Sequence, residues 1–228
     1  MKIFNELTEI KNSCLGLGFF DGLHLGHRAL IQKLIVNADK YNSKSVIITF
    51  KASPAEKFFS EVKYINTLEE RENIISSLGV DYMIELDFNE KLMSLSAEDY
   101  LKNVLIKYFD PNYIISGFNH TFGFKKQGNC DFLRGNESIY GYEFESLSPV
   151  RSDGEVVSSS LVKDALSKGN IKKATNLLGS YFKIGGEVIK GNQIGRTIGF
   201  PTANIEYPET KVVVPFGVYK VKVEYAGI

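Results

Sequence analysis

The fold of this chain is decided by one stretch, CLGLGFFDGLHLGH at residues 14–27, in which an apolar run passes into a glycine-rich loop. The apolar residues at 14–20 are typical of a strand buried in a parallel sheet. After the loop, apolar side chains recur at helical spacing, at Leu30, Ile31, Leu34, Ile35 and Ala38. A strand, a tight loop and a helix in this order predict the start of a βαβ unit.

Three further β-rich runs extend this pattern, at residues 45–50, 82–86 and 113–116. Helices are expected between them at 67–78, before Gly79, and from Ser96, which has Asp99 three residues on, to Asp110. Two more are expected later, from Ser158 to Gly169 and then up to Gly179. The predicted fold class is α/β, with a parallel sheet and crossover helices.

The character of the chain changes near residues 178–182. Five glycines crowd the segment 185–199, and residues 219–225 alternate apolar and charged side chains with the period of a strand. We therefore expect two domains, 1–180 and 181–228. The second is short for a self-standing barrel, so we expect it to be the incomplete first part of a β-barrel.

Composition limits the function classes. The chain has 228 residues, 43% of them hydrophobic, and its 27 basic side chains balance its 27 acidic ones. This balance predicts no long-range attraction to nucleic acid or to an anionic membrane, so local groups must hold any anionic substrate. Two cysteines are too few for a disulfide framework, and we see neither a signal peptide nor a membrane span. We expect a cytoplasmic protein; its oligomeric state is open.

Two of the three histidines, His24 and His27, lie in the loop that follows the first strand. Ligands bind at the carboxyl ends of strands in open α/β sheets, where helix N-termini attract phosphate. Glycines at 18, 22 and 26 allow sharp turns and close approach. Imidazoles placed there can donate to phosphate oxygens. The stretch predicts nucleotidyl transfer, although a pair of histidines that only caps a helix is the competing interpretation.

The loop resembles the G-x-F-D-G-x-H-x-G-H signature of the nucleotidyltransferases that adenylylate FMN. The resemblance implies a Rossmann-like domain with His24 and His27 as catalytic residues, which contact the triphosphate of ATP and stabilise the departing diphosphate. It implies that the rest of the loop binds ATP through Gly18, Phe19, Phe20, Asp21 and Gly26. The K-M-S-K-S loop of class I aminoacyl-tRNA synthetases is absent from the sequence, which argues against that branch.

Two more segments resemble this family. Residues 117–123, GFNHTFG, are similar to G-x-[DN]-F-x-F-G, which implies that Asn119 and Phe122 bind FMN; His120 replaces the usual Phe. On either side, Phe118 and Phe124 are expected in the core. Residues 157–163, VSSSLVK, resemble I-S-S-T-x-I-R, which implies an ATP site at Ser159, Ser160 and Lys163. There a lysine replaces an arginine and loses the bidentate fork.

The run GRTIGFPTAN at 195–204 resembles the signature of riboflavin kinase, a small β-barrel. This resemblance implies an ATP and Mg²⁺ site at Gly195, Arg196, Thr202 and Asn204, with Thr202 and Asn204 as metal ligands. Hard oxygen ligands suit this ion. The whole chain therefore resembles the bifunctional FAD synthetases, in which a riboflavin kinase follows an FMN adenylyltransferase, and ATP, FMN and riboflavin are the small-molecule substrates.

The expected reaction is ATP + FMN → FAD + diphosphate. The kinase's general base is a Glu from a segment that should follow residue 228, and Glu224 is expected to face solvent, so we expect this chain to have no kinase activity. Two alternatives remain. One is an adenylyltransferase with another acceptor, such as a nicotinate or pantetheine phosphate. The other is a flavin-binding or regulatory protein without catalysis, suggested by His120, Lys163 and the run 51–54, which lacks the Asp and His of the family's T-F-D-P-H-P.

Overall fold

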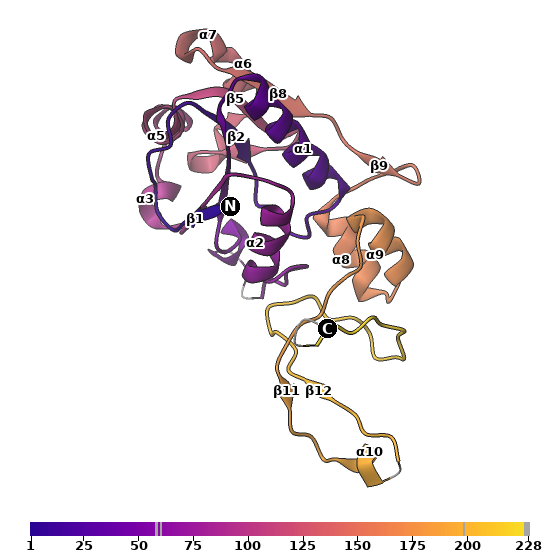
Figure 1. Ribbon diagram of the computed structural model, residues 1–228. Coiled ribbons are helices and arrows are strands. Elements are labelled where there is room, and N and C mark those ends of the chain that lie inside the picture. Colours follow the sequence, from indigo (N-terminus) through magenta and orange to yellow (C-terminus); the bar gives the residue numbers. More distant parts are fainter. Residues whose placement is uncertain (58, 60, 198, 226–228) are drawn as a thin grey trace.

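The central feature of the chain is a six-stranded sheet, seen in a computed structural model that describes residues 1–57, 59, 61–197 and 199–225 (Figure 1). Its strands, in the order in which they lie, are β1 (Lys2–Phe4), β4 (Tyr82–Leu86), β3 (Lys44–Phe50), β2 (Ser13–Leu17), β5 (Pro111–Gly117) and β8 (Glu143–Leu147). All neighbouring strands are parallel. The predicted α/β fold is confirmed.

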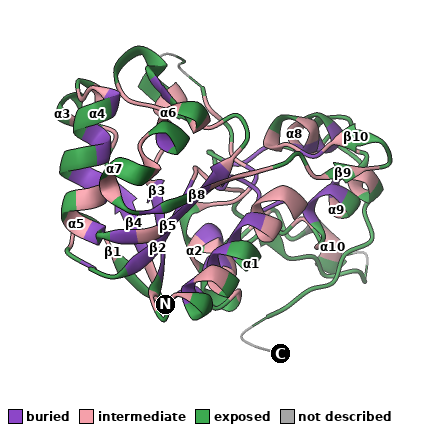
Figure 2. Cartoon of the chain, turned by 90° about the horizontal axis from the view of Figure 1, so that it is seen from above, coloured by how far each residue is buried: buried purple, intermediate pink, exposed green. Residues whose placement is uncertain are grey.

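Helices cover both faces of this sheet. On one face, α1 (Leu25–Lys40) and α2 (Leu68–Ser77) pack on the strands in one hydrophobic cluster. On the other face lie α4 (Ala97–Tyr100), the π-helical segment η2 (Leu101–Ile106), α5 (Lys107–Phe109) and α6 (Cys130–Gly135). Successive side chains of a strand point to opposite faces, so Cys14 of β2 lies in the first cluster and Leu15 in the second. The central strands β2, β3, β4 and β5 are mostly buried (Figure 2).

The helices predicted from the sequence begin where expected, each after a residue whose side chain caps the helix. Thr67 caps α2 in a capping box with Glu70. Ser96 caps α4, and Ser158 caps α8 (Ser159–Ser167), after which α9 (Ile171–Leu178) ends at Gly179. The short remaining elements of this region are η1 (Pro54–Lys57), α3 (Glu90–Met93), β6 (Thr121–Phe122), η3 (Phe124–Lys126), β7 (Gly128–Asn129), α7 (Glu137–Tyr140), β9 (Arg151–Ser152) and β10 (Glu155–Val156).

The strand order places a crevice in the middle of the sheet. From β2, the chain continues to β3 and β4 on one side and to β5 and β8 on the other. Ligands of open α/β sheets bind at such a switch point, outside the carboxyl ends of the strands. Leu17 of β2 pairs with Ser116 of β5. The loops that follow these two strands therefore leave the sheet from adjacent positions.

After α9 the chain forms an arm with little regular structure (Figure 1). It contains β11 (Val188–Ile189), paired antiparallel with β12 (Asn204–Ile205), and the short helix α10 (Ile194–Thr197). The expected strand at 219–225 is wrong: its residues have no strand structure, and Val221, Val223 and Tyr225 are exposed. A strand needs a neighbour to pair with, and none of the described residues pairs with this segment. Among the described residues, no helix is long and apolar enough to cross a membrane.

Candidate active site

The two histidines lie together at the start of α1. His24 is the N-cap residue, and its Nδ1 accepts a hydrogen bond of 3.3 Å from the backbone N–H of His27. Their rings stack with centroids 3.7 Å apart. The edge of the Phe20 ring contacts His27 from the core side, at 5.3 Å between centroids. The sequence placed both histidines at this strand–helix junction, and the structure brings their rings into contact.

Both imidazoles are neutral at neutral pH. Burial lowers the pKa of His24 to about 4, against a smaller opposing effect of the Asp21 carboxylate, and burial also holds the pKa of His27 well below its usual value. Because Nδ1 of His24 accepts, its proton lies on Nε2, where it is free to donate. The first turn of α1 has no acidic side chain, so its unpaired N–H groups and its dipole are left for an anion.

Glycines shape the loop between β2 and α1. Gly22 has φ +84°, and a Cβ there would lie 2.6 Å from Cδ1 of Ile65. At Gly26, a Cβ would lie 3.2 Å from the His24 ring. Gly18 donates to the carbonyl of Ile48 at 3.4 Å. Gly22 is therefore required by packing and by backbone geometry, and Gly26 allows the His24 ring to lie close to the backbone.

The rings of Phe19 and Phe20 both pack against the protein. Phe20 is fully buried in the core at φ +60°, so only its backbone faces the loop. The Phe19 ring lies under the guanidinium of Arg71 and beside the ring of Tyr64. The structure thus uses both rings to fix the loop.

Asp21 joins this loop to the serine segment. Its Oδ1 accepts from the N–H of Ile65 at 2.8 Å, and its Oδ2 pairs with Nζ of Lys163 at 2.7 Å. Ser159 Oγ donates to the Asp21 carbonyl at 2.8 Å. Two segments far apart in the sequence therefore meet, but Lys163 reaches Asp21 and does not stand free. The neighbouring Ser160 is exposed.

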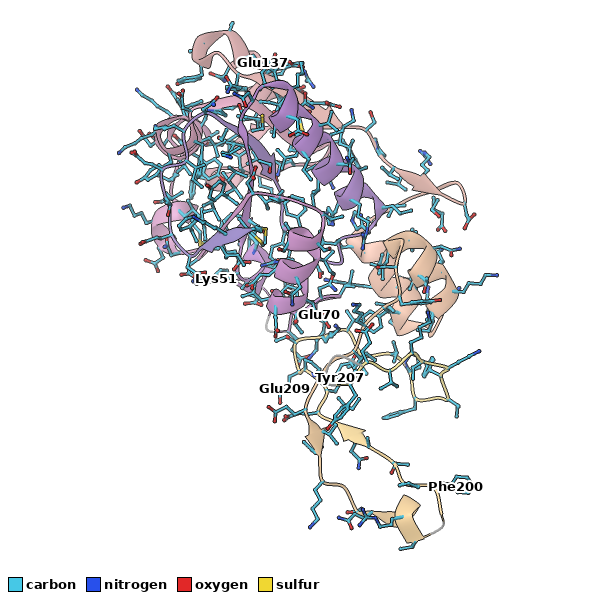
Figure 3. The ribbon with its side chains drawn as sticks, viewed as in Figure 1. Lys51, Glu70, Glu137, Phe200, Tyr207 and Glu209 are labelled. Carbon is cyan, nitrogen blue, oxygen red and sulfur yellow. The ribbon has the colours of Figure 1, made fainter. Side chains whose placement is uncertain are left out.

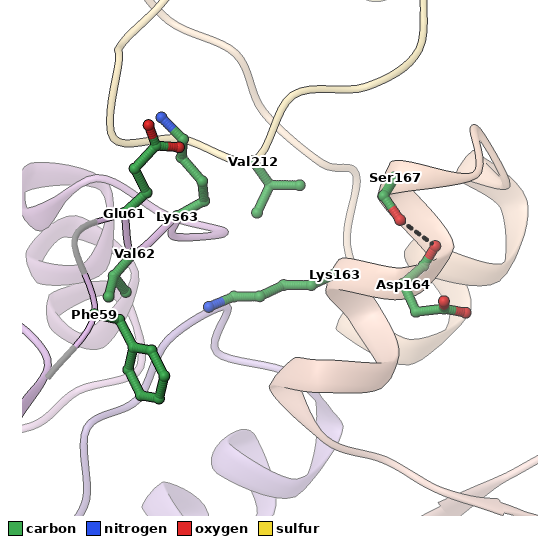
Figure 4. A pocket seen from close by; sticks show the side chains of 8 residues that line it. All are labelled: Phe59, Glu61, Val62, Lys63, Lys163, Asp164, Ser167 and Val212. Carbon is green, nitrogen blue, oxygen red and sulfur yellow. Dashed lines mark hydrogen bonds between the residues drawn. The ribbon is translucent and has the colours of Figure 1, made fainter. Parts of the chain in front are cut away.

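Lys163 crosses an open cleft of about 490 Å³ (Figure 4). Phe59 and Val62 lie on one side of this cleft, and Asp164 and Ser167 of α8 lie on the other. Val212, from the arm, also lines it. The cleft therefore borders the Asp21–Lys163 pair and is formed by three separate parts of the chain.

The loop after β5 differs from expectation at its phenylalanines. Phe118 and Phe124 are 48% and 45% exposed, so their expected core positions are wrong. Both residues follow the end of β5, and neither belongs to a hydrophobic cluster of the described residues. Phe122 instead packs among aromatic rings, with centroid distances of 5.3 Å to Tyr100 and 5.9 Å to Phe132.

Asn119 and His120, neighbours in that loop, differ in exposure. Asn119 is exposed and accessible to a ligand. The His120 ring stacks on Phe122 at 5.8 Å, and its Nε2 is buried without a hydrogen-bond partner. Burial lowers the pKa of His120 to about 4. This histidine fills the aromatic cluster as a neutral ring.

A buried ion pair that the sequence analysis did not identify lies next to the histidine loop. Arg71 of α2 and Glu85 of β4 are 4% and 1% exposed, with 3.6 Å between Nη2 and Oε1. Arg71 also donates to the carbonyls of Phe19 and Phe50, at 3.1 and 2.6 Å. A signal existed: Arg71 shares the apolar stripe of its helix with Ile75, and Glu85 interrupts an apolar strand.

The kinase-like signature forms a second, smaller pocket of about 190 Å³. Arg196, Thr202 and Asn204 line it together. Gly195 lies beside it, where a Cβ would collide with the Phe200 carbonyl. The Thr202 hydroxyl and the Asn204 amide oxygen are donors that suit Mg²⁺. No group of three His, Cys, Asp or Glu side chains placed to hold a metal occurs among the described residues.

Fold and site together define a nucleotidyltransferase, with paired histidines at the first strand–helix junction of a parallel sheet covered on both faces. A sequence profile described as FAD synthetase matches residues 7–161, and one described as riboflavin kinase matches residues 178–228. The chain belongs to the FAD synthetase family.

Relatives agree with this assignment. A bifunctional riboflavin kinase/FMN adenylyltransferase from Buchnera aphidicola subsp. Acyrthosiphon pisum is 36% identical over 99% of this chain and 74% of its own. The protein of the same description from Escherichia coli K12 is 34% identical over 92% of this chain and 67% of its own. A crystal structure from Streptococcus pneumoniae, described as a macrolide-efflux protein, has a TM-score of 0.86 and 30% identity over 96% of this chain and 73% of its own.

Proposed function

We propose that this chain transfers AMP from ATP to FMN. An oxygen of the FMN phosphate forms a bond to the α-phosphorus of ATP, while the bond from that phosphorus to the bridging oxygen of the β-phosphate breaks. The bridging oxygen leaves with diphosphate, and FAD is formed. The observation that carries this proposal is the stacked histidine pair at the start of α1, located at the switch point of the sheet.

His24 and His27 act as neutral donors in this proposal. The Nε2–H of His24 and the N–H groups of the first turn of α1 would hold the β- and γ-phosphates. Negative charge builds on the leaving diphosphate, and fixed donors in a site with little water stabilise that charge without rearranging. His27 would act on the same oxygens, since its ring lies against His24.

The remaining predicted contacts take supporting roles. Gly18 and Gly26 would let the phosphates approach the backbone, with Ser159 and Ser160 at the start of α8 nearby. Asp21 and Lys163 would bind ATP as an ion pair, in which the carboxylate holds the lysine in position. Asn119 and Phe122 would contact FMN across the crevice, because their loop leaves the sheet beside the histidine loop. In-line attack requires such mutual orientation of the two substrates.

Mg²⁺ is part of the proposal as the ion that neutralises phosphate charge. In the second domain, for which we propose residues 181–228, Thr202 and Asn204 would hold the ion and Gly195 and Arg196 would contact ATP phosphates. The oxygen donors that face this small pocket fit such an ion. We also propose a cytoplasmic location, which suits the two cysteines, both free thiols.

Diphosphate release tests the adenylyl transfer. The chain should release diphosphate from Mg-ATP only when FMN is present, and His27→Ala should lower the rate by about 10²-fold, the effect of losing one transition-state donor. His27→Asn should lose less, because its amide retains an N–H donor. Unchanged thermal unfolding would show that both variants are folded.

Two alternatives give different results in the same assay. A flavin-binding protein without catalysis would bind FMN and release no diphosphate. An adenylyltransferase with another acceptor would release diphosphate with a nicotinate or pantetheine phosphate and not with FMN. Full activity of His27→Ala would contradict the assigned roles.

Riboflavin phosphorylation is a separate prediction. The pocket of Thr202 and Asn204 has no carboxylate among the residues that line it, and a kinase needs a base for the riboflavin hydroxyl. We therefore expect the 228-residue chain to produce no FMN from riboflavin and Mg-ATP. Chromatographic detection of FMN at a rate similar to that of adenylyl transfer would contradict this.

A further inference from the structure

Residues 207–214, which we name the strap, return from the arm and lie along residues 63–65. The N–H of Tyr64 donates to the carbonyl of Thr210 at 2.7 Å, and the N–H of Val212 donates to the carbonyl of Tyr64 at 2.8 Å. Nζ of Lys63 donates to the carbonyl of Glu209 at 2.8 Å. Figure 3 shows Tyr207 and Glu209 below the end of α2 that carries Glu70. The strap belongs to the region matched to riboflavin kinase, yet it pairs with the first domain.

The buried side chain of Lys211 holds the strap against the first domain. It is fully buried and forms an ion pair with Glu70, whose carboxylate also completes the capping box of α2 with Thr67. Its ammonium lies 5.2 Å from the centroid of the Phe182 ring. A lysine is almost never fully buried unless it is paired, and breaking a buried pair leaves an uncompensated charge. The strap is therefore held by charge as well as by backbone hydrogen bonds.

The segment under the strap contacts the histidine loop directly. Ile65 is fully buried, its N–H donates to Asp21, and its side chain occupies the space that a Cβ of Gly22 would need. On its other side, Ile65 belongs to the same cluster as Val212 of the strap. Residues 64–65 are thus clamped between the strap and the loop that carries His24.

We propose that the strap positions the histidine loop for adenylyl transfer, with Lys211 as a positioning residue, so that the kinase-like region contributes to the first active site. This inference rests on the proposed function. Without the Lys211–Glu70 pair, the strap would loosen, and Ile65 would no longer hold Asp21 and Gly22 in place. His24 and Lys163 both depend on that geometry, because Asp21 belongs to the loop that carries His24 and pairs with Lys163.

The first test replaces Lys211 with Met, which has a similar shape and no charge, and compares it with Lys220→Met at an exposed lysine. We expect Lys211→Met to raise the KM for ATP and lower kcat/KM about tenfold, since small displacements of positioning groups carry costs of this order or larger. Amide hydrogen exchange in residues 19–29 should become faster. Lys220→Met should leave the KM for ATP, kcat/KM and the exchange rate in residues 19–29 unchanged.

A second pair of variants covers the case in which Lys211→Met does not fold. Val212→Ala trims the hydrophobic cluster that Val212 shares with Ile65 without changing charge, and Val213→Ala, at a 61% exposed neighbour, is its control. We expect Val212→Ala to raise the KM for ATP about threefold, with faster exchange in residues 19–29.

The two readouts separate this inference from the proposed function. If the wild-type chain releases diphosphate and both Lys211→Met and Val212→Ala leave KM and exchange unchanged, the strap inference is overturned. If exchange responds as expected and the wild-type chain releases no diphosphate with FMN, the positioning of the loop is supported and the proposed function fails.

Discussion

Arg71 and Glu85 are two charged side chains buried where β2, β3 and β4 end, and they do not contribute equally. Arg71 donates to the carbonyls of Phe19 and Phe50 and lies over the Phe19 ring. Burial, with the neighbouring Glu72 carboxylate, raises the pKa of Glu85 to about 7. Near neutral pH, the glutamate is therefore ionised only part of the time. The guanidinium, which ties two strand ends together, is the more important partner.

Because the two side chains contribute unequally, replacing one or the other should lower the free energy of unfolding by different amounts. Arg71→Met should lower the free energy of unfolding by about 3–5 kcal/mol, because it takes the guanidinium from the Phe50 carbonyl and the buried Glu85 carboxyl group and leaves the Phe19 carbonyl with the Thr49 hydroxyl as its remaining side-chain donor. Glu85→Gln should cost less than about 2 kcal/mol, since it keeps the shape and Arg71 keeps its carbonyl partners. Urea unfolding at neutral pH measures both. Equal losses would show that the ion pair, and not the carbonyl hydrogen bonds, holds this corner of the fold.

At the level of elements, the sequence predicted what depends on local signals. The buried strands β2 to β5 appear as apolar runs, and helices begin at the predicted positions, after Thr67, Ser96 and Ser158. The edge strands β1 and β8 were missed because they are short and partly exposed, so they lack such runs. Residues 219–225 have the alternating pattern of a strand, but none of the described residues pairs with them. Periodicity does not show whether a partner strand exists.

In the candidate site, too, local sequence signals identify some residues, whereas other contacts arise only when the chain folds. His24 and His27 were identified because loop, glycines and helix are contiguous in the sequence. The pairing of Asp21 with Lys163, and that of Glu70 with Lys211, join residues far apart in the chain. Arg71 was overlooked because a single charge on an apolar helix stripe is normally read as exposed. Tertiary packing alone determines these contacts.

For the molecule as a whole, the histidines make stability depend on pH. His24 is buried, and His27 and His120 are partly buried; burial lowers the pKa values of all three, and those of His24 and His120 are about 4. In the unfolded chain, a histidine titrates near about 6.5. As pH falls below this value, the unfolded state binds protons that the folded state does not bind, so the free energy of unfolding falls. Glu85 opposes this, because its pKa is raised to about 7 and the folded state binds its proton first.

Three histidines against one glutamate give a net uptake on unfolding that grows below about pH 6.5 and reaches about two protons near pH 5, where the free energy of unfolding should fall by about 3 kcal/mol per pH unit. Urea unfolding midpoints at several pH values across this window measure the slope. His120→Phe removes one of the three protons and keeps an aromatic ring against Phe122, so its slope should be about half as steep. A midpoint that stays constant from neutral pH to about 5 would mean that the buried histidines accept protons without unfolding. In that case, the phosphate site would contain imidazolium donors and not the neutral ones inferred from their burial.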